Sequence, residues 1–119
     1  MYTFDSRVRY SEVGEDARIT VNAIIDYMQD CTNFQSEDLG VGLEYHKKKQ
    51  LMWVLNSWQI VIEKYPAMGE EITVGTQAYG FEKMFGYRNF LITDSSGECV
   101  AKANSIWVLM DLKKTRPMI

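Results

Sequence analysis

The side chains that could perform chemistry are few in this chain and lie far apart in the sequence. His46 is the single histidine, and the two cysteines are Cys31 and Cys99. No Cys-x-x-Cys or His-x-x-x-His spacing occurs, so the sequence predicts no metal site. Nothing in the spacing supports a thiol–imidazole pair, and a histidine beside three lysines is typical of a surface. We therefore interpret both cysteines as reduced, small apolar side chains.

Carboxylates on a predicted helix offer a second kind of chemistry. Asp26 and Asp30 fall within that helix and Glu37 follows it. A carboxylate in a cleft between a helix and a sheet can have a raised pKa and act as a general base. Asp26 and Glu37 are the candidates for a catalytic base, and the simpler interpretation is a solvated polar face.

Three consecutive lysines, Lys47, Lys48 and Lys49, form the charged centre of a polar segment over residues 43–50. Such a run is usually a solvated loop. Its functional alternative is a docking site for an acidic partner, since opposite charges steer association.

Large apolar side chains could line a binding slot instead of filling a core. The relevant residues are Met28, Met52, Trp53, Trp58 and Trp107. They are simply explained as core residues, but methionine adapts well to flexible apolar ligands. The sequence alone leaves both interpretations open.

The elements that must position these residues are one helix and several strands. Thr20 can cap a helix that runs to about Phe34, and its apolar positions recur every three or four residues. A short first strand is expected from Phe4 to about Ser11. Four further strands are predicted at residues 51–63, 71–81, 85–93 and 99–111, the first with both faces covered. Residues 94–97 read as a hairpin turn, and residues 113–117 as a linker.

The order of these elements predicts an α+β protein. Burying one long central helix against a curved, antiparallel, five-stranded sheet is the hot-dog arrangement, and we expect residues 1–119 to form a single hot-dog domain. Such a sheet leaves an edge strand, and lone edges invite association. A second hot-dog domain or a homodimer partner is therefore expected.

Composition excludes several classes of protein. The chain has 119 residues, is 46% hydrophobic and carries a formal net charge of −3. This balance argues against disorder and against nucleic acid as a partner. Its apolar stretches are shorter than a membrane span, and the first residues lack the pattern of a signal peptide, so we expect a cytoplasmic protein.

Three blocks of sequence carry motifs that point to a known family. The first combines residues 9–16 with the helix end Tyr-Met-Gln-Asp at 27–30. The second, residues 48–70, contains a lysine, Leu-Met-Trp-Val, a long strand and Tyr-Pro-Ala-Met-Gly-Glu. The third contains Arg-Asn-Phe-Leu at 88–91, Gly-Glu at 97–98 and Ala-Asn-Ser-Ile-Trp-Val-Leu-Met at 103–110. In these motifs and in their order, nearly end to end, the chain resembles the N-terminal half of the acyl-ACP thioesterases of plants and bacteria.

This resemblance implies hydrolysis of the thioester that joins a fatty acid to acyl carrier protein, without a cofactor. The family has two hot-dog domains in tandem, and its second half carries an Asp-x-Asn-x-His motif. That motif is absent from these residues, so the resemblance implies an acyl-binding half that is inactive alone. We expect the acyl slot to be lined by Ile25, Met28, Thr32, Trp53 and Leu55. Lys47, Lys48 and Lys49 are then expected to meet the acidic carrier protein.

Two alternatives remain open at this point. One is a stand-alone homodimeric hot-dog that hydrolyses acyl-CoA with a helix carboxylate such as Asp26 or Glu37. The other is a non-catalytic acyl-binding module, which would bind fatty acid without turnover.

Overall fold

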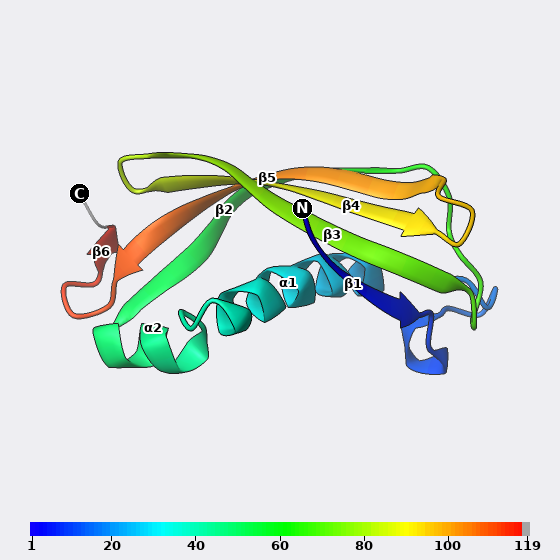
Figure 1. Cartoon of the computed structure of the whole chain (residues 1–119), viewed down its shortest axis with the longest axis horizontal. Coiled ribbons are helices and arrows are strands. Elements are labelled where there is room, and N and C mark those ends of the chain that lie inside the picture. Colours follow the sequence, from blue (N-terminus) through cyan, green and yellow to red (C-terminus); the bar gives the residue numbers. More distant parts are fainter. Residues whose placement is uncertain (118–119) are drawn as a thin grey trace.

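An antiparallel sheet curls over one 18-residue helix in this protein, and the computed structural model describes residues 1–117 (Figure 1). The strand order is β1-β3-β4-β5-β2, and a short sixth strand pairs with β5. Every pairing is antiparallel. The strands are β1 (Tyr2–Arg7), β2 (Leu51–Ile62), β3 (Glu71–Glu82), β4 (Phe85–Asp94), β5 (Cys99–Asp111) and β6 (Arg116–Pro117). The predicted α+β class and the order of strand, helix and four strands are confirmed.

Helix α1 (Val21–Asp38) lies beneath the concave face of the sheet (Figure 1). The Thr20 hydroxyl accepts a hydrogen bond from the Ala23 amide at 3.2 Å, which confirms the predicted N-cap. Burial follows the helical period, so one stripe faces the sheet. The buried residues of the stripe are Ala23, Ile24, Tyr27, Met28 and Cys31.

Two faces of the sheet are distinguished by burial and by contacts with α1. The inner face, toward α1, carries Val74 on β3, Phe90 and Ile92 on β4, and Ala101 and Ala103 on β5, none more than 7% exposed. On the outer face, the alternate positions of β2 are exposed, as are Lys102 and Asn104 in the first half of β5. The hydrophobic core therefore lies between α1 and the middle of the sheet.

A second helix, α2 (Leu43–Lys49), precedes β2, where the sequence predicted a polar loop. Its first free amide, on Leu43, donates to Glu37 Oε1 at 2.8 Å, and Gln50 ends it with a left-handed φ of 56°. Three lysines in its last turn interact favourably with the helix dipole. These caps explain why the segment is helical.

Other boundaries also differ from those predicted. The first strand ends at Arg7, and a 3₁₀ turn, η1 (Tyr10–Glu12), follows it. Helix α1 continues to Asp38 instead of ending near Phe34. The segment expected to be a linker contributes β6, so the sheet has six strands and not five.

The prediction that both faces of β2 are covered is wrong. Its side chains alternate between half-buried and exposed along nearly the whole strand, and Met52, Val54 and Val61 are 52%, 43% and 47% exposed. Strand β2 is an edge of the sheet, with β5 on one side only. Its outer apolar side chains therefore face solvent.

No helix within residues 1–117 combines the length and the apolar character that crossing a membrane requires.

Candidate functional site

Apolar side chains on the inner face remain partly accessible at the end of the sheet where β2 begins. Leu55 pairs with Trp107 of β5, and Trp53 pairs with Leu109. All four are half-buried, whereas the central inner residues nearer the β4–β5 turn are buried. We call Trp53, Leu55, Trp107 and Leu109 the distal inner face. It offers apolar surface toward the helix side of the sheet.

A close approach of backbone to an aromatic ring shapes this region. Gly86 on β4 lies beneath the Trp53 ring, and a Cβ atom there would come within 3.1 Å of Trp53 Cζ3. The Phe81 ring borders the same position, with Cε1 3.3 Å from that Cβ atom and its centroid 6.1 Å from that of Trp53. A side chain at position 86 would therefore require the Trp53 ring to shift by a few tenths of an ångström.

A guanidinium lies at the boundary between the buried core and the distal inner face. Arg88 Nη1 donates to Gln35 Oε1 of α1 at 2.7 Å and to Thr76 Oγ1 of β3 at 3.1 Å. Burial lowers the pKa of Arg88, because the charged form loses water. Arg88 is thus a half-buried cation on the inner face whose two acceptors are both neutral.

The backbone around Arg88 is fixed by further hydrogen bonds. The Ser105 hydroxyl donates to the Arg88 carbonyl at 3.0 Å, and Trp107 Nε1 donates to Ser105 Oγ at 2.8 Å. The Thr76 hydroxyl donates to the Asn89 carbonyl at 3.1 Å. Thr76 and Ser105 are at most 1% exposed, so this polar network is an interior one. We call Arg88, Gln35, Thr76 and Ser105 the Arg88 cluster.

The five predicted slot residues fall into separate places. Met28 is fully buried in the core, and Ile25 is half-buried beside it on α1. Trp53 and Leu55 belong to the distal inner face. Thr32 is half-buried one turn before Ser36, and its Oγ1 has no hydrogen-bond partner within residues 1–117. The structure thus groups Trp53 with Leu55, and Ile25 with Met28.

The two predicted carboxylates have different surroundings. Glu37 caps α2 through the Leu43 amide, as described above. Asp26 is exposed on α1, one turn from Asp30. The pKa of Asp30 is raised, first by burial and then by the like charge of Asp26. Glu37 therefore has a structural use, whereas Asp26 is free to meet solvent.

Basic and apolar side chains share the surface of α2. Lys47, Lys48 and Lys49 are exposed in its last turn. Leu43 and Tyr45 of the same helix are 71% and 39% exposed, and Leu39 before it is 69% exposed.

The two cysteines lie away from α2. Cys31 is buried under β3, where burial raises its pKa to about 11, and Cys99 is half-buried on β5.

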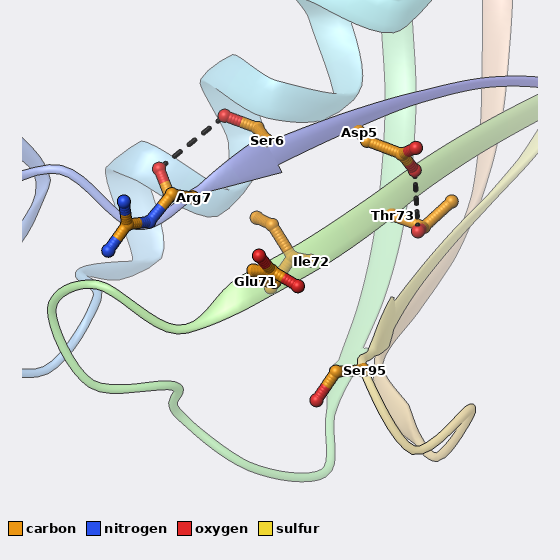
Figure 2. A pocket seen from close by; sticks show the side chains of 7 residues that line it. All are labelled: Asp5, Ser6, Arg7, Glu71, Ile72, Thr73 and Ser95. Atoms are coloured by element: carbon orange, nitrogen blue, oxygen red, sulfur yellow. Dashed lines mark hydrogen bonds between the residues drawn. The ribbon is translucent and has the colours of Figure 1, made fainter.

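A hollow lies at the opposite edge of the sheet, against β1, and has a volume of about 440 Å³ (Figure 2). The Thr73 hydroxyl donates to Asp5 Oδ1 at 2.8 Å within it, so these polar groups already satisfy each other. A second hollow adjoins it at Arg7, beside Met68 and Gly69. The lining residues in Figure 2 are Asp5, Ser6, Arg7, Glu71, Ile72, Thr73 and Ser95.

The sequence interpretation did not predict the Arg88 cluster. A signal was present, because Arg88 shares strand parity with Phe90 and Ile92, whose side chains are buried. A charged residue at an inward position of an apolar strand predicts a buried polar site. Its partner Gln35 lies beyond the predicted end of the helix and carried no such signal.

Comparisons with known proteins agree with the family named from the sequence. The family model described as the acyl-ACP thioesterase N-terminal domain matches residues 1–119. A palmitoyl-acyl carrier protein thioesterase of Arabidopsis thaliana is 28% identical over 116 residues, which are 92% of this chain and 28% of that protein. The chain thus spans less than a third of this curated relative.

Solved structures show the same fold. A Lactobacillus plantarum protein assigned as an oleoyl thioesterase superposes with a TM-score of 0.95 at 29% identity, over 98% of this chain and 46% of that one. The 12:0-ACP thioesterase of Umbellularia californica gives a TM-score of 0.86 at 26% identity, over 99% and 46%. The chain therefore spans about half the length of these proteins.

Proposed function

Because this chain belongs to the acyl-ACP thioesterase N-terminal domain family, we propose that it is the acyl-binding half of an enzyme that releases fatty acid from acyl carrier protein. The observation that carries this proposal is the distal inner face. Trp53, Leu55, Trp107 and Leu109 present apolar surface toward the helix without being fully covered. A hydrocarbon tail that covers them gains about 0.8 kcal/mol per buried methylene.

Two of the residues expected from the sequence, Trp53 and Leu55, form the apolar wall in this proposal. Thr32 and Ile25 are half-buried on α1, and Met28 supports them from the core. Chain-length preference then depends on how far the tail extends along the inner face. Each additional carbon changes affinity only modestly.

The basic surface of α2 is the proposed docking site for acyl carrier protein. Lys47, Lys48 and Lys49 are exposed together in one turn. An acidic partner would be steered toward them, and this attraction weakens as salt is added. Leu43 and Leu39 add exposed apolar contacts beside the charges.

The free edge of β2 is the proposed contact with a second hot-dog domain. This 12-residue strand pairs with β5 on one side and offers unpaired backbone groups on the other. The second domain would supply the groups that activate water, since these residues lack Asp-x-Asn-x-His. We therefore expect the chain alone to bind acyl groups and not to hydrolyse them.

Binding and turnover measured on the same sample test this proposal. The protein is titrated with palmitoyl-carrier protein, and release of the carrier thiol is followed in parallel. Binding without turnover above background is the expected result. Leu55→Gln should weaken binding because it places an amide on the inner face. Val54→Gln, one residue earlier on the outer face, is the matched control and should bind normally. Equal affinities for the two variants would exclude the distal inner face as the acyl site.

A stand-alone homodimer that hydrolyses acyl-CoA is the second candidate, favoured by the free β2 edge. It requires turnover by the unmodified chain and a loss of turnover in Asp26→Asn. The Glu37→Gln variant is less informative, because Glu37 also caps α2. A non-catalytic acyl-binding module would bind fatty acid itself, with no preference for the carrier-bound form.

We further propose a reducing compartment, such as the cytoplasm, for this protein. Cys31 and Cys99 are both free thiols, as in proteins kept reduced. The Arabidopsis relative is described as chloroplastic, and cell fractionation would distinguish a cytoplasmic protein from an organellar one.

A further inference from the structure

Arg88 is a half-buried cation that forms no ion pair with a carboxylate of residues 1–117. The ion pairs within residues 1–117 join Arg9 with Glu12, and Lys64 with Asp94 and Glu98. Arg88 instead donates to an amide oxygen of Gln35 and a hydroxyl oxygen of Thr76. Withdrawing a charge partly from water costs stability unless its hydrogen bonds are kept. The position of Arg88 on the inner face of the sheet therefore needs a functional explanation.

The place of Arg88 on the sheet suggests that reason. Cross-strand pairing aligns Arg88 with Ser105 and Trp58. The preceding inner row contains Phe90 and Ala103, which are 2% and 7% exposed. The following row contains Gly86, Trp107 and Leu55, and here the Trp107 and Leu55 side chains are half-exposed. Arg88 thus lies where the filled core ends and the accessible apolar surface begins.

We propose that Arg88, held between Gln35 and Thr76, forms the end wall of the acyl slot and sets the longest chain that the slot accepts. This inference rests on the acyl-binding function proposed above. It assigns a specificity role to Arg88 and a positioning role to Gln35. A tail that covers the distal inner face meets the guanidinium before it reaches Phe90.

A comparison of free energies indicates that the Arg88 side chain stays in place when an acyl tail reaches it. Each buried methylene improves binding by about fourfold. Moving the guanidinium aside would break its hydrogen bonds to the half-buried Gln35 and the buried Thr76, and this loss outweighs the gain from burying one or two methylenes. The wall is also rigid, because Ser105 holds the Arg88 carbonyl and Thr76 holds that of Asn89.

Three variants test the inference with one measurement. Arg88→Met replaces the charged end by a shorter, apolar one, and Gln35→Met removes the acceptor on α1 while keeping a good helix former. Lys102→Met is the matched control, because Lys102 is exposed on the adjacent strand β5. The measurement is the equilibrium affinity of the protein for octanoyl-, dodecanoyl- and palmitoyl-carrier protein, with thermal melts to verify folding.

The expected result for Arg88→Met is a rise in the ratio of palmitoyl to octanoyl affinity. A gain of roughly two methylenes corresponds to about fifteenfold. Gln35→Met should shift the ratio in the same direction by less, and Lys102→Met should leave it unchanged. Gln35→Met alters only a half-buried position in the last turns of α1 and should fold. If Arg88→Met does not fold, the affinity ratio of Gln35→Met tests the inference.

The outcomes separate the inference from the function on which it rests. Octanoyl binding by the unmodified protein with identical chain-length profiles for all folded variants would overturn the role of Arg88 alone. Absence of binding for every acyl chain would overturn the proposed function, and the inference with it. A shift caused equally by Lys102→Met would show that loss of positive charge, not the end wall, changes the profile.

Discussion

Replacing Tyr27 by phenylalanine should destabilise the protein by about 1.5 kcal/mol, the lower end of the range for a hydrogen bond to a charged group. Tyr27 is 3% exposed, and its hydroxyl lies 2.6 Å from Glu12 Oε1, 3.0 Å from the Arg7 carbonyl and 3.2 Å from Ser6 Oγ. The phenol has one proton, and the nearest and only charged acceptor is Glu12. Ser6 then donates to the phenol oxygen.

The lower end of the range applies because Glu12 keeps other partners. Its carboxylate still accepts from the Arg9 amide at 2.8 Å and from Arg9 Nη1 at 3.3 Å after the phenol is removed. Glu12→Gln in a double-mutant cycle should give a coupling of about 1 kcal/mol with Tyr27→Phe. The bond joins η1 to α1, so its loss loosens the segment that precedes the helix.

Urea unfolding at neutral pH measures this loss of stability. The slope of the unfolding free energy against urea concentration should be the same for wild type and variant. Tyr10→Phe is the matched control, because Tyr10 is 83% exposed in η1. Equal stabilities of the two variants would refute the assignment of the proton to Glu12. A second test uses pH: burial, and then the bond to Glu12, raises the pKa of Tyr27 above its ordinary value of about 10. Its contribution is therefore complete below pH ~10 and is lost at higher pH, so the difference between wild type and Tyr27→Phe should shrink there.

Three further outcomes follow from buried or paired groups. Thr32→Val should raise the free energy of unfolding by about 1 kcal/mol, since a buried hydroxyl that has no hydrogen-bond partner among residues 1–117 is replaced by a methyl group; a lower free energy in urea unfolding would contradict this. Cys31, whose pKa is raised to about 11 by burial, should resist maleimide until the protein unfolds, whereas Cys99 should react first; mass spectrometry of the labelled peptides decides. Asp94→Asn should lower stability at neutral pH, because the bond to Lys64 holds the pKa of Asp94 well below its usual range. That stability is present above the unfolded value of about 3.9 and is lost as the pH falls, so the variant should show a weaker acid dependence between pH ~4 and ~2 in far-UV circular dichroism.

The main strands and the long helix could be predicted because local pattern and tertiary structure agree there. Thr20 is a good N-cap, and the apolar spacing after it continues as a buried stripe. Helix α2 could not be predicted in the same way. Its seven residues are too few to be stable alone, and a carboxylate of Glu37 from the preceding helix caps it. A cap supplied by tertiary contact leaves no local pattern.

The two faces of β2 could not be assigned from sequence for a specific reason. A β-bulge between Leu55 and Ser57 shifts the register against β5. Inner-facing positions are odd up to Leu55 and even from Trp58 onward, so large apolar residues occur at both parities. If strict alternation is assumed along the whole strand, these apolar residues fall on both faces, and the strand is wrongly predicted to be covered on both. This shift also places Trp58 on the inner face, where its ring centroid lies 5.3 Å from that of Phe90 in the core.

The length of α1 explains why part of the inner face needs another cover. Its 18 residues span about 27 Å at 1.5 Å per residue, whereas the longest extent of the molecule is 45 Å. The helix begins over the buried rows of the sheet and ends just after Gln35, where Arg88 meets it. Beyond that point α1 does not continue, and the side chains of the distal inner face are only half-buried. An acyl tail, held under β2 by a second domain at the free edge, would complete this layer. In the chain alone, without an acyl group, Trp53 should therefore lie in a more polar environment and fluoresce at longer wavelength. Its emission should move to shorter wavelength when an acyl group binds.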